Sequence, residues 1–142
     1  MSYFQNETKI GSGPGREGGQ QDWGYGIVEQ LVPISALGGA GTKNHTFYLP
    51  NCRIYNIMID VETAWDSVTS AVLSVGTTGT PTLFTGSINA KTGGRTVGTF
   101  TAAQCTAIRA VAAGAYTVQV VTVGTGNAGA GNVRIHYAPI KP

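Results

Sequence analysis

The sequence predicts an all-β protein: an antiparallel β-sandwich, jelly-roll-like and of about eight strands, with an extended Gly-rich N-terminal arm. Apolar and polar residues alternate with a period of two in several segments, which is typical of strands that bury one face. Turn signals rich in Gly, Pro, Asn and Ser separate these segments about every eight to twelve residues, and long helical patterns are absent.

The clearest strand signal lies in Ala115 to Tyr137, which contains two alternating runs. Between them, Gly124 to Gly131 is rich in residues that accept positive φ and poor in side chains that would continue a strand. The sequence therefore predicts a long hairpin here, around which other strands must pair, because a lone hairpin is marginal in water. Its apolar members are Val118 and Val120, then Val133, Ile135 and Tyr137.

Earlier in the chain, Ile27 to Ile34 reads as a strand that ends near Pro33, which cannot donate to a central ladder. The short strand His45 to Leu49 stops at a Pro-Asn turn signal. In the longer strand Cys52 to Thr63, alternation predicts two faces. Tyr55, Ile57, Ile59 and Val61 would lie on one face, and Asn56, Met58, Asp60 and Glu62 on the other.

Val68 to Val75 alternates in the same way and predicts the next strand. Leu83 and Phe84 form a short apolar stop or a short strand, Ser87 to Gly94 reads as a loop, and Thr96 to Thr101 as a further strand.

The segment Thr101 to Ala113 supports two interpretations. Thr101 followed by Gln104 fits a capping box, and Ala102, Cys105, Ile108 and Ala112 would form a helical stripe. Cys105 to Val111 can also be read as a strand that leads into the predicted hairpin. We predict the strand, because the flanking segments are β.

Two parts of the chain differ in amino-acid composition: an arm, residues 1–22, and a sandwich domain, residues 23–142. Gly11 to Gly19 holds five glycines and one proline in nine residues, which cannot pack by itself. Ahead of it, Tyr3, Phe4 and Ile10 could anchor the tip in a groove of another protein. The arm is either a disordered leader or a segment that orders on a partner.

Only 11% of the residues are charged, while small polar residues and the 21 glycines are abundant. Such a surface suits association with other protein surfaces, because few charges must lose water on contact. A net charge of +2 does not favour nucleic acid, and we expect no membrane span and no signal peptide. In a reducing cytosol we expect Cys52 and Cys105 to be free, buried thiols.

Motifs for catalysis are weak. His45 opens a predicted strand and His136 lies on the polar face of the last one, without a nucleophile in a recognisable context. Gly38 to Lys43 lacks the spacing of a phosphate loop. We therefore expect no enzyme, no catalytic residues and no cofactor.

The acidic residues Asp60, Glu62 and Asp66 form the one candidate cation site. A wet strand face is the simpler reading of this cluster, because the ligand spacing of an ordered loop is missing, and we expect no metal. Trp23, Tyr25 and Trp65 lie next to loops, where aromatic rings could stack on sugars, insert into a neighbouring subunit, or cap the sandwich core.

Three stretches carry a resemblance to a known group of proteins. They are Thr63 to Thr77 (TAWDSVTSAVLSVGT), Ala113 to Val118 (AGAYTV) and Gly131 to Tyr137 (GNVRIHY). Over roughly Cys52 to Ala138 the chain is similar to small structural proteins of tailed bacteriophage virions. The resemblance implies a head decoration, cement or fibre-like protein on a β-sandwich, often a homotrimer, and it offers no catalytic motif to carry over.

Together these features predict a virion protein, assembled in the cytoplasm of a bacterial host, that binds and stabilises the exterior of a phage capsid. The expected partners are the major capsid protein or another virion protein, and further copies of the chain. The candidate contact residues are Tyr3, Phe4, Ile10, Arg16, Trp23, Tyr25 and Trp65. The alternative is a receptor- or glycan-binding module of a phage tail or fibre, which would use Trp23, Tyr25 or Trp65.

Overall fold

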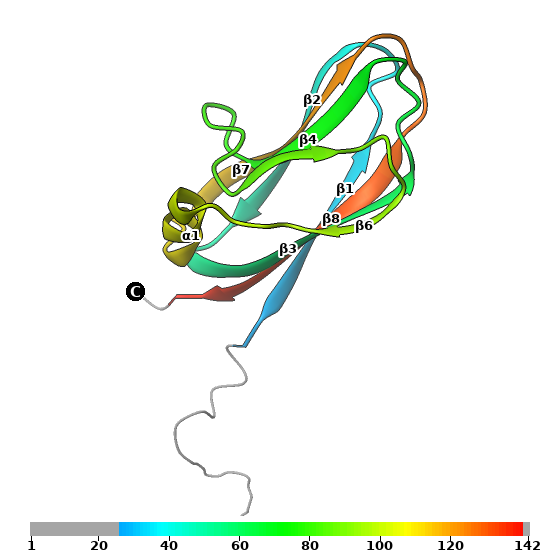
Figure 1. The fold of residues 1–142 in the computed structure, drawn as a ribbon. Coiled ribbons are helices and arrows are strands. Elements are labelled where there is room, and N and C mark those ends of the chain that lie inside the picture. Colours follow the sequence, from blue (N-terminus) through cyan, green and yellow to red (C-terminus); the bar gives the residue numbers. More distant parts are fainter. Residues whose placement is uncertain (1–25, 141–142) are drawn as a thin grey trace, which may run out of the picture.

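The protein folds into eight β-strands and one short helix, and the computed structural model describes residues 26–140 (Figure 1). The elements are β1 (Val28–Ser35), β2 (Gly41–Leu49), β3 (Cys52–Thr63), β4 (Ser70–Gly76), β5 (Thr85–Asn89), β6 (Gly94–Val97), α1 (Ala102–Arg109), β7 (Gly114–Val123) and β8 (Ala130–Pro139). Within residues 26–140, no helix has the length and apolar character needed to cross a membrane.

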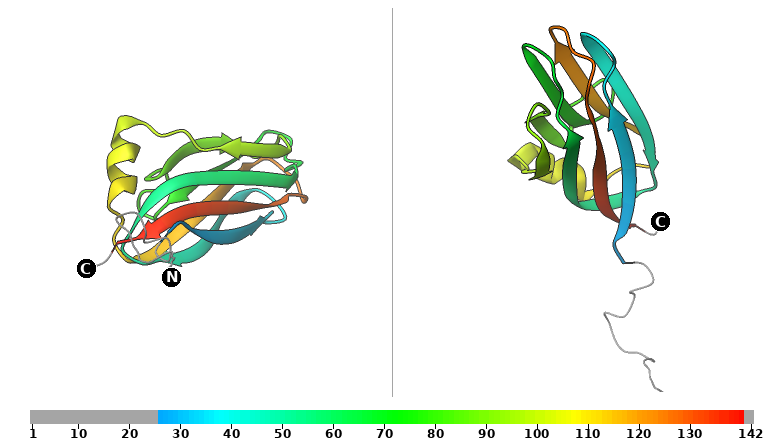
Figure 2. Two further views of the ribbon diagram at one scale, coloured as in Figure 1. Left: turned by 90° about the horizontal axis from the view of Figure 1, so that it is seen from below. Right: turned by 90° about the vertical axis from the view of Figure 1, so that its right-hand side faces the viewer.

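The strands form two antiparallel sheets of four, in the orders β1-β8-β3-β6 and β2-β7-β4-β5. The two sheets pack face to face as the layers of a sandwich (Figure 2). The predicted antiparallel β-sandwich of about eight strands is therefore confirmed, and the strand order is that of a jelly roll. Among consecutive strands only β4 and β5 are neighbours in one sheet; every other connection passes from one sheet to the other.

The core lies between the inner faces of the two sheets and is apolar. One sheet contributes Ile57 and Ile135, and the other Leu73 and Val118, all at most 1% exposed. Phe84, just before β5, packs against Tyr116 of β7 with ring centroids 5.2 Å apart. Because burying one such aliphatic or aromatic side chain contributes about 1.5–3 kcal/mol, this inner layer dominates stability.

A β-bulge in β3 changes which residues face the core. The register with β8 shifts between Ile54 and Asn56, so Cys52 and Ile54 point inward before the bulge, and Ile57 points inward after it. Tyr55, at the bulge, is 52% exposed. The prediction that Tyr55 shares a face with Ile57 is therefore wrong, because an extra residue reverses the alternation.

The predicted hairpin between β7 and β8 is also wrong. β7 pairs with β2 and β4, whereas β8 pairs with β1 and β3 in the opposite sheet. The connection, residues 124–129, is an arch that crosses the end of the sandwich. A Gly-rich loop permits a hairpin and an arch alike, and the two strands each find better partners elsewhere in the chain.

Trp65 and Asp66, between β3 and β4, hold this arch in place. Trp65 is 2% exposed, and a Cβ on Gly129 would come within 2.3 Å of its ring, so the arch backbone lies directly against the indole. Asp66 accepts hydrogen bonds from the backbone N–H groups of Asn127 and Ala128, at 2.8 and 2.9 Å. The glycine at 129 is thus required both by this close approach and by its positive φ of 156°.

The segment after β6 contains the helix α1, so our prediction of a strand across Cys105 to Val111 is wrong. The side chain of Thr101 accepts from the Gln104 N–H at 3.3 Å, and the Gln104 side chain accepts from the Thr101 N–H at 2.9 Å. This capping box satisfies two donors at the helix start. Only Val111, past the helix end, bridges to Cys52 as a strand would.

Several predicted boundaries move. β2 begins at Gly41 rather than at His45, β5 includes Ser87 to Asn89, which we predicted as loop, and β6 ends at Val97. Cys52 and Cys105 are both free thiols; Cys52 is buried, but Cys105 is exposed, against the expectation that both are buried.

We predict that Gly129→Ala lowers the free energy of unfolding by about 1–3 kcal/mol, because the new methyl group would overlap the Trp65 ring. Urea denaturation of the two chains measures the difference. Gly39→Ala is the matched control, since its φ of 152° is similar to the 156° of Gly129 and a Cβ there meets nothing within 4 Å. Equal stability of the two variants would contradict the close packing of the arch.

Candidate interaction surfaces

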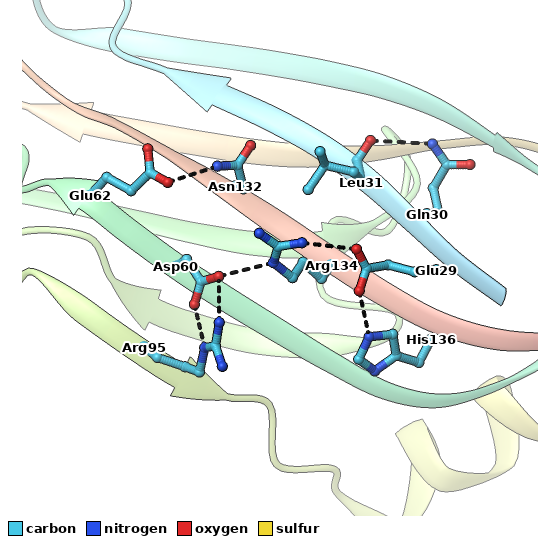
Figure 3. Close-up of polar contacts among 9 residues, drawn as sticks. All are labelled: Glu29, Gln30, Leu31, Asp60, Glu62, Arg95, Asn132, Arg134 and His136. Atoms are coloured by element: carbon cyan, nitrogen blue, oxygen red, sulfur yellow. Dashed lines mark hydrogen bonds and ion pairs between the residues drawn. The ribbon is translucent and has the colours of Figure 1, made fainter. Parts of the chain in front are cut away.

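The outer face of the β1-β8-β3-β6 sheet carries a chain of charged side chains (Figure 3). Arg95 of β6 donates from Nε and Nη2 to the Asp60 carboxylate of β3, at 2.6 and 3.0 Å. Arg134 of β8 donates to Asp60 at 3.1 Å and to Glu29 of β1 at 2.8 Å. His136 adds a contact to Glu29 at 3.0 Å. The network therefore ties all four strands of this sheet together on its outer side.

The electrostatics follow from these contacts. The hydrogen bond from Arg95, together with that from Arg134, lowers the pKa of Asp60 to about 2. The hydrogen bonds from His136 and Arg134 lower the pKa of Glu29. Both carboxylates are therefore ionised at neutral pH and compensated by their neighbours on the sheet.

The three acids that we considered as a cation site do not converge. Asp60 is occupied by the two arginines, Glu62 accepts from Asn132 at 3.1 Å, and Asp66 caps the arch at the end of the sandwich. Among residues 26–140, no group of three or more His, Cys, Asp or Glu side chains could hold a metal ion. Each carboxylate thus has its own local structural partner.

The outer face of the β2-β7-β4-β5 sheet has the opposite character. Its outward positions are the residues that alternate with buried ones such as Phe47, Val118 and Leu73. None of these outward positions on the four strands is charged. The accessible ones are Thr42, Asn44, Thr46, Tyr48, Ser70, Val72, Asn89, Ala115, Gln119, Val121 and Val123. We call this set the uncharged face.

Cross-strand pairs make the uncharged face continuous. Val121 of β7 lies opposite Val72 of β4, and both are only partly buried. Beside them, the Gln119 side chain donates to the Asn44 side chain of β2 at 3.3 Å. At the end of β2, Tyr48 is 71% exposed. Such a face can be covered by another protein without stripping water from any charge.

The neighbouring edge, between β1 and β2, is closed by polar contacts. His45 Nε2 accepts from the Ser35 N–H at 3.1 Å, and its Nδ1 lies 3.3 Å from the Val118 carbonyl oxygen. These partners require a neutral ring that carries its proton on Nδ1. Lys43 donates to Ser35 Oγ at 2.8 Å. His45 thus joins the two sheets, and both hydrogen-bond partners of its ring in the described part of the chain are backbone groups.

The predicted contact residues divide into two groups. Tyr3, Phe4, Ile10, Arg16, Trp23 and Tyr25 lie outside the described residues. Trp65 is buried against Gly129, so a contact of its ring with a sugar or a partner does not fit this structure; it caps the core, the other role that we considered for it. The uncharged face was missed by the sequence analysis, although the absence of Lys, Arg, Asp and Glu from alternate positions of four strands was a signal for it.

We predict that Asp60→Asn lowers the free energy of unfolding at pH 7 by about 1 kcal/mol, because it removes ion pairs with two arginines. The pKa of Asp60 is about 2 in the folded chain, against about 3.9 in an unfolded one, so its stabilising effect is complete above about pH 4 and disappears as the pH falls through 2. Denaturation from pH 7 to pH 2 tests both statements. Glu62→Gln, which removes an acid without an arginine partner, is the control; a pH-independent difference between Asp60→Asn and the original chain would refute the assignment.

A second pH effect comes from His45. Burial, with a smaller effect of Lys43 and an opposing one of the Val118 carbonyl, lowers the pKa of His45 below 6.5. An unfolded chain therefore takes up this proton first, and stability falls as the pH drops below about 6.5. In His45→Gln this part of the loss should vanish between pH 6.5 and 5, as measured by thermal unfolding at a series of pH values. An unchanged slope would exclude His45 as its source.

Comparison of the chain with profiles of known protein families, with curated proteins and with solved structures finds no match. Its function must therefore be inferred from its own surfaces.

Proposed function

We propose that the protein is a structural component of a bacteriophage virion, which binds the exterior of the capsid as a decoration or cement protein and stabilises it. The observation that carries this proposal is the uncharged face, a four-stranded surface of Thr, Asn, Gln, Ser and Val side chains. The similarity to phage structural proteins, noted from the sequence, points the same way. Jelly rolls also occur in viral capsid and lectin domains, but that is an analogy of fold and adds little by itself.

The charge distribution supports attachment through one side of the sandwich. The ion-pair network from Glu29 to Arg95 lies on the opposite sheet, where water can solvate the charges that remain exposed. If the uncharged face meets the capsid, the charged face points outward and keeps the particle surface hydrated. Burial of the charged face would remove water from its charges and is therefore unfavourable. This difference orients the protein on its partner.

Repetition strengthens such an attachment. A homotrimer at positions of local threefold symmetry would present three uncharged faces to the shell, and each further contact would form at high local concentration. The arm, residues 1–22, would add contacts between neighbours. Even a modest affinity of one face is then sufficient for stable decoration.

The glycan-binding alternative has less support. Of its three aromatic residues, Trp65 is 2% exposed, and the other two lie outside the described part of the chain.

We predict that Thr46→Glu weakens binding to capsids roughly tenfold or more, because it places an unpaired carboxylate where the shell would exclude water. Purified chain is mixed with particles from which the native protein has been stripped, and the bound fraction is measured by co-sedimentation over a range of concentrations. Thr106→Glu, the same substitution on the exposed surface of α1, is the matched control and should bind normally. Equal binding of the two variants would exclude the uncharged face, and failure of the original chain to bind would exclude the capsid.

A further inference from the structure

The free strand edges on the two long sides of the sandwich differ in whether they are blocked against pairing with another strand. On one side, the Ser35 N–H of β1 points away from β8 and donates to His45 of the other sheet. Backbone direction alternates along a strand, so Pro33, two residues earlier, also faces this free edge and offers no N–H there. Proline and a cross-sheet contact are ordinary means of blocking an edge against another strand.

On the other side, among residues 26–140, β5 pairs only with β4 and β6 only with β3. The Ala90 N–H donates to Ala71 of β4 at 2.8 Å, so the peptide groups of Asn89, and of Ser87 two residues before, point to the open side. The Gly98 N–H donates to the Ile57 carbonyl of β3 at 2.8 Å, so the peptide groups of the adjacent Val97 also point to the open side. Neither β5 nor β6 contains a proline. This side presents two unblocked edges that face each other.

A groove of about 420 Å³ lies between these edges. It is lined by residues 85–89, 92 and 96–99, most of which carry hydroxyl or amide side chains or none, and none of these lining residues is charged. Ile88 and Val97 add apolar contact on either side. Unpaired backbone N–H and C=O groups beside small side chains suit an extended peptide. Such a peptide binds through its main chain and places alternate side chains in the groove.

We propose that this groove binds the N-terminal segment of a neighbouring copy of the chain as an added strand. Twenty-five residues precede the described part of the chain, enough for a reach of roughly 80 Å if extended. Within them, residues 3–10 (YFQNETKI) contain no Gly or Pro, and Phe4 and Ile10 fall on the same side of an extended chain. The glycine-rich stretch from Gly11 to Gly19 follows as a tether.

The route favours a neighbour over the same chain. β1, which the segment precedes, lies at the opposite end of its sheet from β6. To reach its own groove across the outer side of that sheet, the segment would cover the network of Arg134, Asp60 and Arg95 and remove water from its charges. A segment given to the next copy avoids this crossing. The contact is head-to-tail, so it closes into a ring if the geometry of the copies allows.

Two variants of the full-length chain test the proposal. Ser87→Pro removes an N–H that, by alternation from Ala90, points away from β4 into the groove, and Ser87→Ala is its control. Phe4→Asp combined with Ile10→Asp charges the segment, and Ser2→Asp combined with Ser12→Asp is its control. Should Ser87→Pro fail to fold, Val97→Pro on β6 makes the same test from the other edge. Mass is measured by analytical ultracentrifugation, and protection of the groove amides by hydrogen exchange.

The original chain and both controls are expected to sediment as oligomers, and each test variant as a 14.7 kDa monomer. Exchange at Val97 should be at least tenfold faster in both test variants, and exchange at Ser87 at least tenfold faster in the Phe4→Asp/Ile10→Asp variant, which keeps that amide. A mixture of the two test variants should form a mixed dimer, because one supplies an intact segment and the other an intact groove. Oligomers of folded Ser87→Pro, or a mixture that stays monomeric, would overturn the proposal. A monomeric original chain would also overturn the proposal. If the groove amides of that monomer were protected, the groove would hold the chain's own N-terminal segment. None of these outcomes depends on capsid binding.

Discussion

The fold depends on the contact between the connection after β3 and the arch between β7 and β8. β7 and β8 each lie inside their own sheet, so the arch joins the centres of the two layers. Trp65 packs against Gly129, and Asp66 accepts from two arch N–H groups, which leaves the arch little freedom to fold back as a hairpin. The Val68 N–H adds a bond to the Thr125 carbonyl at 3.0 Å. The strands β7 and β8, which follow each other in the sequence, are thus kept in different sheets by the Trp65 ring, the Asp66 carboxylate and the absence of a Cβ at Gly129.

Because the strands are divided between the two sheets in this way, the charged side chains are also distributed unequally between the two outer faces. Glu29, Asp60, Arg95 and Arg134 come from four different strands, and they meet because those strands are neighbours in one sheet. The other sheet receives strands whose outward residues are neutral. A chain with few charges therefore has one hydrated face and one face that another protein can cover at low cost, and our proposals for capsid attachment and for exchange of the N-terminal segment use different parts of this asymmetry.

Local signals and their context competed in the segment that became α1. The spacing of Thr101 and Gln104 predicts a capping box, and the structure forms it; our preference for a strand relied on the β character of the flanks. Gln104 also donates to the Thr82 carbonyl at 3.0 Å, so the helix start is tied to the loop before β5. A specific pair of hydrogen bonds at a helix start outweighed the average tendency of the neighbouring segments.

The sequence alone determined the class of fold, most of the strands and the apolar faces that contain residues such as Ile57, Ile59 and Val118, because alternation is a local property of each strand. It could not determine which sheet a strand joins, because a Gly-rich connection such as residues 124–131 is compatible with a hairpin and with an arch. Nor could it place Tyr55 outside and Trp65 inside, since one depends on a bulge set by the partner strand and the other on a glycine more than sixty residues away. The ion-pair network, the uncharged face and the groove beside β5 and β6 were decided only by tertiary structure, because each is made of residues that pairing between distant strands brings together.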